Sequence, residues 1–165
     1  MAVGNRGEKA QRQDGADDMR RIDTSSLEDI LGFHLRMANV ALYHDFSRAM
    51  EDLGLTQKQV AVLELIAQNE GASQIDIAAT LGMDRATMMS LVNRLEDRNL
   101  VARRPSPVDR RRQQLILTGE GQEILASCRD LIAAHERKFT GRFSKEELKT
   151  FVGFLKRVYA GDSSG

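Results

Sequence analysis

The residues of this chain best suited to chemistry are arginines gathered between positions 84 and 112. The stretch holds eight arginines and four acidic residues, whereas the whole 165-residue chain has 24 basic and 24 acidic residues and no net charge. Arginine forms paired hydrogen bonds with phosphate and fits a narrow minor groove better than lysine does. This local surplus predicts contact with a polyanion. The arginines are Arg85, Arg94, Arg98, Arg103, Arg104, Arg110, Arg111 and Arg112.

Two predicted helices joined by a tight turn position the first of these arginines. A short helix over 73–81, the turn 82–84 and a longer helix reaching Arg98 have the proportions of a helix-turn-helix. Ala78 is small where the two helices must cross, and Gly82 permits the positive φ that such a turn commonly needs. The second helix would then lie in the major groove of DNA, with its N-terminal residues at the base edges.

The residue types at the start of that second helix suit base recognition. They include a forked donor, hydroxyls and apolar groups, which read guanine, phosphate and the thymine methyl group. An ordinary amphipathic helix with Arg85 and Arg94 on its solvated face is the alternative. The predicted DNA contacts on the two helices are Ser73, Gln74, Asp84, Arg85, Ala86, Thr87, Met89, Ser90 and Arg94.

A β-hairpin is predicted directly after the helix-turn-helix. Two short extended runs, 100–104 and 114–117, flank a segment that contains Pro105, Pro107 and most of the remaining arginines. Arginines at the tip of such a hairpin would reach the adjacent minor groove, and this position favours a DNA-binding surface over an ordinary amphipathic helix. The predicted contacts here are Arg104, Asp109, Arg110 and Arg111.

The other predicted elements are helices with recognisable start signals. The capping-box pattern Ser25-x-x-Glu28 opens a long helix that closes at Gly54, and Thr56, Thr118 and Ser144 each precede a further helix. The long first helix is apolar over more than one face, which predicts burial against both its own domain and a second subunit. The predicted order is four helices, a hairpin and two helices.

Composition limits the remaining possibilities. Aromatic residues make up 5% of the chain and tryptophan is absent, which favours a mainly helical fold. Residues 1–25 are charged and glycine-containing with few large apolar groups, so a disordered tail is predicted. Because the sequence has no long apolar run and no signal-peptide pattern, a soluble cytoplasmic protein without membrane association is expected.

Two other functional classes fit the sequence less well. An enzyme is disfavoured because the chain has no glycine-rich phosphate loop and no nucleophile elbow, and because His34, His44 and His135 are scattered. No cofactor is predicted, and the single cysteine, Cys128, excludes an intramolecular disulfide and a cysteine-based zinc site. A helical protein-interaction module without DNA binding is the second alternative. It is disfavoured because such a module has no evident use for an arginine-rich hairpin.

The segment Asp109-Arg110-Arg111-x5-Leu117-Thr118, following Leu100-Val101-x-Arg103, resembles the multiple-antibiotic-resistance regulator (MarR) family. The resemblance extends from Leu27 to about Ala160. It implies a mainly α winged helix-turn-helix with an intertwined helical dimerisation region. Residues 26–54 and 119–160 would dimerise and 55–118 would bind DNA. Asp109 would brace the hairpin wing, and Arg111 would enter the minor groove.

The resemblance also implies a homodimer on a near-palindromic double-stranded operator, commonly as a repressor released by a small-molecule effector. Family members bind that effector in a cleft between the dimerisation helices and the DNA-binding lobe. The segment 32–46 is similar to the first helix of members that sense aromatic acids as coenzyme A thioesters. An arginine there would pair with a phosphate or carboxylate, although a salt bridge to another helix explains Arg36 equally well. The predicted lining is Phe33, His34, Arg36, Met37, Val40, Tyr43, His44, Phe46, Leu63 and Ile66.

Oxidant sensing through Cys128 is the alternative within the same fold. Redox-responsive relatives generally carry their cysteine in the first helix, where this chain has none. A structural, inert Cys128 is therefore expected, because a reactive thiol needs both access and a lowered pKa.

Overall fold

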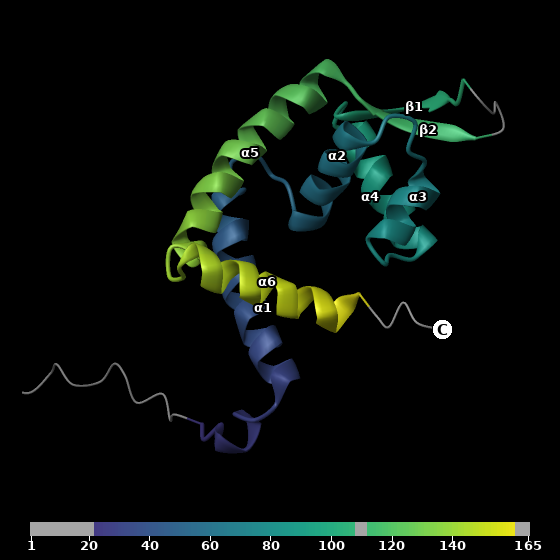
Figure 1. Ribbon diagram of the computed structural model, residues 1–165. Helices are drawn as coiled ribbons and strands as arrows, with labels where there is room; N and C mark the ends of the chain where they lie inside the picture. Colours follow the sequence, from purple (N-terminus) through teal and green to yellow (C-terminus); the bar gives the residue numbers. More distant parts are fainter. Residues whose placement is uncertain (1–21, 108–111, 161–165) are drawn as a thin grey trace, which may run out of the picture. The chain divides into compact units, whose positions relative to one another are not determined.

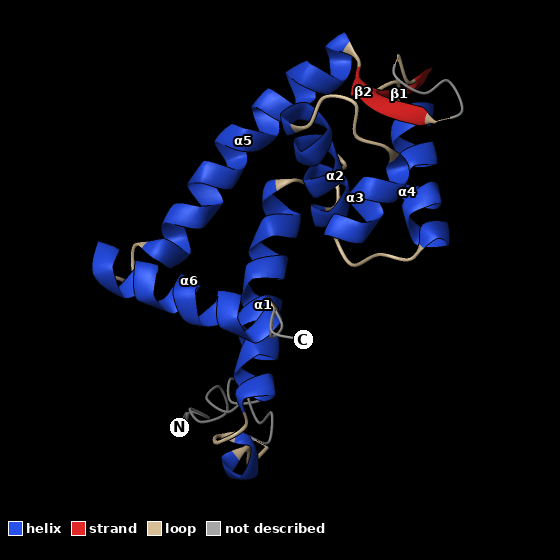
Figure 2. Ribbon diagram, turned by 45° about the vertical axis from the view of Figure 1, so that its right-hand side comes forward, coloured by secondary structure: helices blue, strands red, loops and turns tan. Residues whose placement is uncertain are grey.

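The computed structural model describes residues 22–107 and 112–160. Six α-helices and one hairpin make up this part of the chain (Figures 1 and 2). In chain order they are α1 Leu31–Ala49, α2 Gln57–Gln68, α3 Gln74–Thr80, α4 Arg85–Asp97, β1 Val101–Pro105, β2 Gln113–Leu117, α5 Gly119–Thr140 and α6 Lys145–Tyr159. The predicted mainly helical winged helix-turn-helix is confirmed. The predicted contacts Asp109, Arg110 and Arg111 and most of the predicted tail lie outside the described residues.

The chain divides into two units, Met1–Met37 and Ala38–Gly165, and each is described by itself. In the first unit the capping box expected at Ser25 is wrong. Residues Ser25–Leu27 form a 3-10 turn, and α1 begins at Leu31. The Asp23 carboxylate accepts a hydrogen bond from the Ser25 backbone N–H at 2.9 Å, so the local polar groups favour a turn at this point.

The other predicted helix starts are confirmed in the second unit. Thr56, Ser73 and Ser144 each form a reciprocal capping box with the residue three positions on, and Thr118 accepts a hydrogen bond from the Gly121 N–H at 2.9 Å. These side chains satisfy amide groups that have no partner within the helix. The starts of these helices therefore follow from the local sequence. The predicted end of the first helix at Gly54 is wrong, because α1 ends at Ala49 and the Leu53 and Gly54 N–H groups donate to carbonyls only three residues back, in turns.

The helix-turn-helix consists of α3 and α4, joined through Gly82 with φ +60°. The Met83 N–H donates to the carbonyl of Ala78 at 2.9 Å, which closes the turn. In the hairpin, β1 pairs antiparallel with β2 in the register Val101 with Leu117 and Arg103 with Leu115. The Leu115 N–H also donates to the carbonyl of Ala72 at 2.9 Å, which anchors the hairpin beside the start of α3.

One hydrophobic core joins these elements to α2 and α5. Leu63 on α2, Met88 and Leu95 on α4, Leu115 on β2 and Leu125 on α5 are buried almost completely. Burial of a side chain of this size contributes about 1.5–3 kcal/mol. The core thus fixes the recognition helix and the hairpin against a common support.

Helix α6 and one side of α1 carry exposed apolar side chains. On α6 no residue is buried, and Phe151, Phe154, Val158 and Tyr159 are all exposed. Tyr43 on α1 is half exposed. Among residues 22–107 and 112–160, no helix is long and apolar enough to cross a bilayer.

Candidate nucleic-acid interface

The N-terminus of α4 is built by Asp84. Its carboxylate accepts hydrogen bonds from the Thr87 backbone N–H at 2.8 Å and from the Thr87 hydroxyl at 2.6 Å. These bonds, the side-chain one foremost, lower the pKa of Asp84 below its usual value. Asp84 and Thr87, both predicted to contact DNA, therefore hold each other at the start of the helix.

The other predicted contacts on α4 are open to solvent. Arg85, Ala86, Met89, Ser90 and Arg94 are all exposed, with Met89 50% exposed. Across the described residues, the guanidinium groups of Arg85 and Arg94 have no carboxylate or other hydrogen-bond partner. This face of α4 therefore presents unneutralised cations beside hydroxyl and apolar groups.

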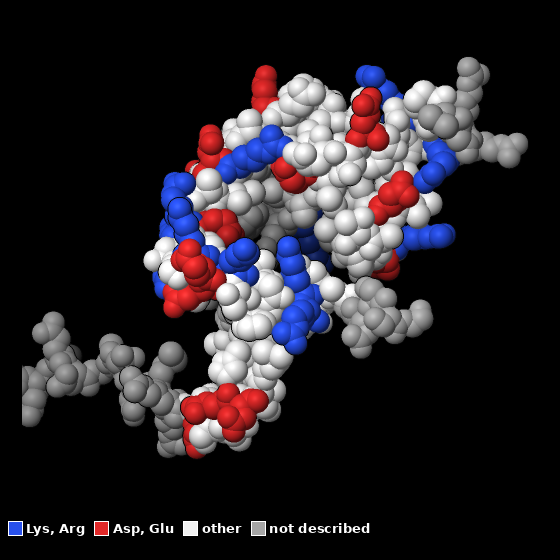
Figure 3. Space-filling view, in the orientation of Figure 1, with Lys and Arg blue, Asp and Glu red and all other residues white. Residues whose placement is uncertain are grey.

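In and beside the hairpin, one described arginine has no partner and two are paired with carboxylates. Arg104 on β1 is exposed and has no partner among the described residues. Arg112, directly before β2, lies 3.2 Å from both carboxylate oxygens of Asp76 on α3, and Arg103 forms an ion pair with Glu96 on α4. In Figure 3 basic side chains stand apart around α3, α4 and the hairpin, with acidic ones between them.

Arg98, at the C-terminus of α4, is also used within the protein. Its guanidinium donates to the carbonyls of Leu53 and Gly54, at 2.9 and 2.8 Å. The predicted basic surplus counted all eight arginines from 85 to 112, whereas the predicted DNA contacts left out Arg98, Arg103 and Arg112. Arg98, Arg103 and Arg112 bind protein groups, so the described arginines of this stretch that have no partner are Arg85, Arg94 and Arg104.

The two predicted contacts at the start of α3 have intramolecular partners. Ser73 is 6% exposed, and its hydroxyl donates to the Asp76 carboxylate at 2.7 Å, which is the main reason that the pKa of Asp76 is lowered. The Gln74 side-chain oxygen accepts from Arg103 at 3.3 Å. A DNA contact by either residue stays a prediction.

The residues predicted to line an effector cleft fall in both units. In the first, Phe33 is half-buried while His34, Arg36 and Met37 are exposed, and His34 Nε2 lies 2.6 Å from the Glu28 carbonyl. In the second, Val40 is half-buried, Tyr43 and His44 are exposed, and Phe46, Leu63 and Ile66 are buried. Leu63 and Ile66 belong to the hydrophobic core. A role of these residues in effector binding stays a prediction.

Sequence reasoning missed a buried ionic cluster between α1 and α5. The carboxylate of Asp45 lies 2.8 Å from His135 Nδ1 and 3.0 Å from Lys138 Nζ. The rings of Phe46 and Phe139 meet the His135 ring edge-on, with centroids 5.7 and 5.2 Å away. Arg48, three positions further along α1, also pairs with the Asp45 carboxylate at 3.2 Å. The sequence showed only this local pair on a largely apolar helix, because His135 and Lys138 lie 90 and 93 positions away.

Comparisons with known proteins agree with this geometry. Residues 53–112 match the MarR family. A proposed transcriptional regulatory protein for the hcr operon of Thauera aromatica is 35% identical over 147 residues, which cover 88% of this chain and 89% of that protein.

Two solved structures are similar over most of their length. The transcriptional repressor CouR bound to a 23-mer DNA duplex has a TM-score of 0.78 and 32% identity, over 83% of this chain and 97% of that one. CouR from Rhodococcus jostii RHA1 bound to p-coumaroyl-CoA has a TM-score of 0.75 and 26% identity, over 82% of this chain and 95% of that one.

The exposed face of α4 and the adjoining hairpin define a transcriptional regulator of the winged helix-turn-helix class. Its relatives named above are regulators rather than enzymes. The chain belongs to the MarR family.

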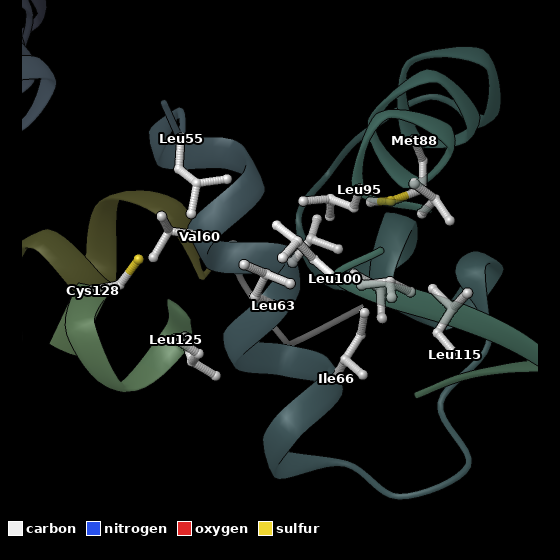
Figure 4. Close-up of a cluster of buried hydrophobic side chains, with 14 of the residues drawn as sticks. Leu55, Val60, Leu63, Ile66, Met88, Leu95, Leu100, Leu115, Leu125 and Cys128 are labelled. Carbon is white, nitrogen blue, oxygen red and sulfur yellow. The ribbon is translucent and has the colours of Figure 1, made fainter. Parts of the chain in front are cut away.

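Cys128 is expected to be chemically inert in the folded protein. Its side chain is fully buried on α5 and points toward Val60 (Figure 4). Burial raises the pKa of the thiol, with Arg98 acting weakly in the opposite direction. A disulfide-exchange reagent such as DTNB should therefore react at least about a hundredfold more slowly in buffer than in denaturing urea.

A Ser127→Cys substitution in a Cys128→Ala background is the matched control, because Ser127 is exposed on the same helix turn. Its thiol should react quickly in the folded state. Equal native rates for the two thiols would contradict the expected inertness and revive the oxidant-sensing alternative.

Proposed function

We propose that this protein is a homodimeric repressor that binds a near-palindromic operator and is released by a small aromatic effector or its coenzyme A thioester. The observation that carries the proposal is the exposed face of α4, where Arg85 and Arg94 have no partner among the described residues. In a helix-turn-helix this face lies in the major groove, and arginine pairs with guanine there. The hairpin would contact the adjacent minor groove.

The exposed apolar residues support the dimer. Phe151, Phe154 and Val158 recur on one side of α6 and remain 43–55% exposed, although Phe151 stacks on Phe143 and the Arg157 guanidinium lies over the Phe154 ring. A second copy of the chain would bury them, because exposed apolar patches of this kind commonly mark interaction sites. Light scattering coupled to size exclusion should give twice the 18.4 kDa chain mass. A monomeric mass at micromolar concentration would overturn the dimer.

The effector class is supported by the CouR complex with p-coumaroyl-CoA, together with the aromatic and basic residues of α1. A ligand releases DNA only if it binds the two states with different affinity. The localisation expected for such a regulator is the cytoplasm.

The test is a fluorescence titration of the duplex upstream of the protein's own gene at two salt concentrations. It is repeated with p-coumarate, p-coumaroyl-CoA and free coenzyme A. The proposal would be supported by sequence-selective, salt-sensitive binding that p-coumarate or p-coumaroyl-CoA abolishes and free coenzyme A does not. Binding that ignores every compound would reject this effector class, and absence of selective binding would reject the operator.

Arg85→Ala should relax sequence preference. If Arg85 pairs with a guanine, the substitution costs about 1–3 kcal/mol on the preferred duplex and little on a scrambled one. Competition binding with single-base variants of the duplex measures the change. Arg94→Ala serves as a comparison on the same helix. An equal loss for Arg85→Ala on every sequence would show that Arg85 contacts only phosphate.

A further inference from the structure

Arg103 on β1 is the meeting point of the wing and both helices of the helix-turn-helix. The wing is the hairpin formed by β1 and β2. The Arg103 guanidinium pairs with the Glu96 carboxylate, donates to Asn93 Oδ1 at 2.8 Å and reaches Gln74 Oε1 at 3.3 Å. Glu96 and Asn93 lie on α4 and Gln74 lies on α3, so one side chain joins three elements.

The guanidinium of Arg103 is paired within the protein, whereas that of Arg104, the next residue, is not. The side chains of Arg103 and Glu96 are 28% and 30% exposed, and the carboxylate neutralises the guanidinium. Arg104 is exposed on the opposite face of β1, because successive side chains alternate along a strand. Arg103 is therefore placed to hold protein groups, whereas Arg104 is placed to meet an external anion.

The position of Arg103 along β1 explains why its contacts with α3 and α4 matter. Val101 is buried and Ala102 is half-buried, while Arg104 and Pro105 are exposed. Arg103 is thus the last residue of β1 that is not exposed, and its side chain bonds to both helices. A two-stranded hairpin is marginally stable by itself, so its direction depends on such contacts.

We infer that Arg103 is a positioning residue that sets the direction of the wing relative to α4, so that the two elements engage DNA as one rigid surface. This inference rests on the proposed operator binding. It separates Arg103 from the arginines that touch DNA. Arg112, directly before β2, pairs with Asp76 and supports the wing beside its other strand.

Arg103→Met is the first test, and Arg104→Met is its matched control. The probes are the duplex that the wild-type protein selects from a random pool and a scrambled duplex of equal composition. Affinity is measured at several salt concentrations, at a temperature where circular dichroism shows each variant folded. Arg103→Met should weaken selected-duplex binding about 10- to 100-fold and leave scrambled-duplex binding unchanged. Arg104→Met should weaken both and reduce the salt slope on the scrambled duplex by about one.

A double-mutant cycle isolates the contact itself. Glu96→Gln keeps an acceptor but removes the charge, and Arg103→Met should cost less in that background than in the wild type. If Arg103→Met does not fold, Asn93→Ala removes one acceptor from an exposed position and should still lower selectivity severalfold.

The outcomes separate the inference from the proposed function. Equal losses on both duplexes for Arg103→Met, with a shallower salt slope, would show that Arg103 contacts phosphate and overturn the inference. Unchanged selectivity in all these variants would reduce Arg103 to a purely structural role and overturn it as well. If the wild-type protein enriched no duplex from the random pool, the proposed operator binding itself would be rejected.

Discussion

Replacing Gly121 by alanine is expected to destabilise the protein more than most single substitutions. An alanine Cβ at this position would lie 1.9 Å from the carbonyl oxygen of Leu100 and 2.9 Å from its carbonyl carbon. Both are backbone atoms, so relief requires moving either α5 or the start of β1. Overpacking costs about 1–3 kcal/mol where side chains can adjust, and we expect at least the upper end here. Urea unfolding followed by circular dichroism at fixed protein concentration measures the loss.

Gly119→Ala is the control for this substitution. Gly119 is the first residue of the same helix, and no atom lies within 4 Å of the position its Cβ would take. Alanine should leave stability unchanged or raise it by about 0.4–1 kcal/mol, because it restricts the unfolded chain. Equal destabilisation by the two substitutions would contradict the close approach of α5 to Leu100.

Asp45→Ala is expected to have the second large effect, by breaking the ionic cluster between α1 and α5. His135 is 4% exposed, and the Asp45 carboxylate is the partner of its Nδ1 at 2.8 Å. Removing one member of a buried pair leaves the other without compensation, which is far more costly than losing a surface salt bridge. The urea midpoint should fall well below that of Asp52→Ala, which removes an exposed acid just beyond α1.

Acid titration of stability tests the same cluster. The hydrogen bond with His135, followed by that with Lys138, lowers the pKa of Asp45 from 3.8 to about 2. Because the folded pKa lies below the unfolded value, the stabilisation is complete above about pH 4 and is lost as the pH falls through about 2.

The conservative variant Asp45→Asn keeps an acceptor but cannot ionise. Its urea midpoint should lie below that of the wild type at neutral pH, and the difference should shrink between about pH 4 and pH 2. A difference that stays constant across this range would show that the charge of Asp45 does not stabilise the fold.

Much of the architecture was predictable because its signals are local. A capping box depends on residues three positions apart, and the helix starts predicted at Thr56, Ser73 and Ser144 are each closed by such a box. The failure at Ser25 is informative, since the same pattern there is overridden by Asp23, which holds the backbone in a turn. Local patterns therefore predict a helix start only where nearby groups do not compete for the same amides.

The roles of individual arginines were less predictable. Composition alone located the basic stretch from 84 to 112, but it could not separate Arg103 from Arg104, which are adjacent in sequence. Their difference arises from the pleat of β1 and from the carboxylate of Glu96 on α4. The number of charged residues in a segment indicates where an interface lies, whereas ion pairs within the protein determine which of those residues can contact a ligand.

The order of the helices, the helix-turn-helix, the hairpin and the family resemblance were predictable, because caps, turns and hydrophobic periods extend over only a few residues. Which arginines are neutralised, why Gly121 must lack a side chain, and which residues of α5 pair with Asp45 were visible only in the folded chain. Each of these depends on atoms brought together from distant positions, as with Asp45 and His135, which are 90 residues apart. Local sequence patterns do not predict such contacts.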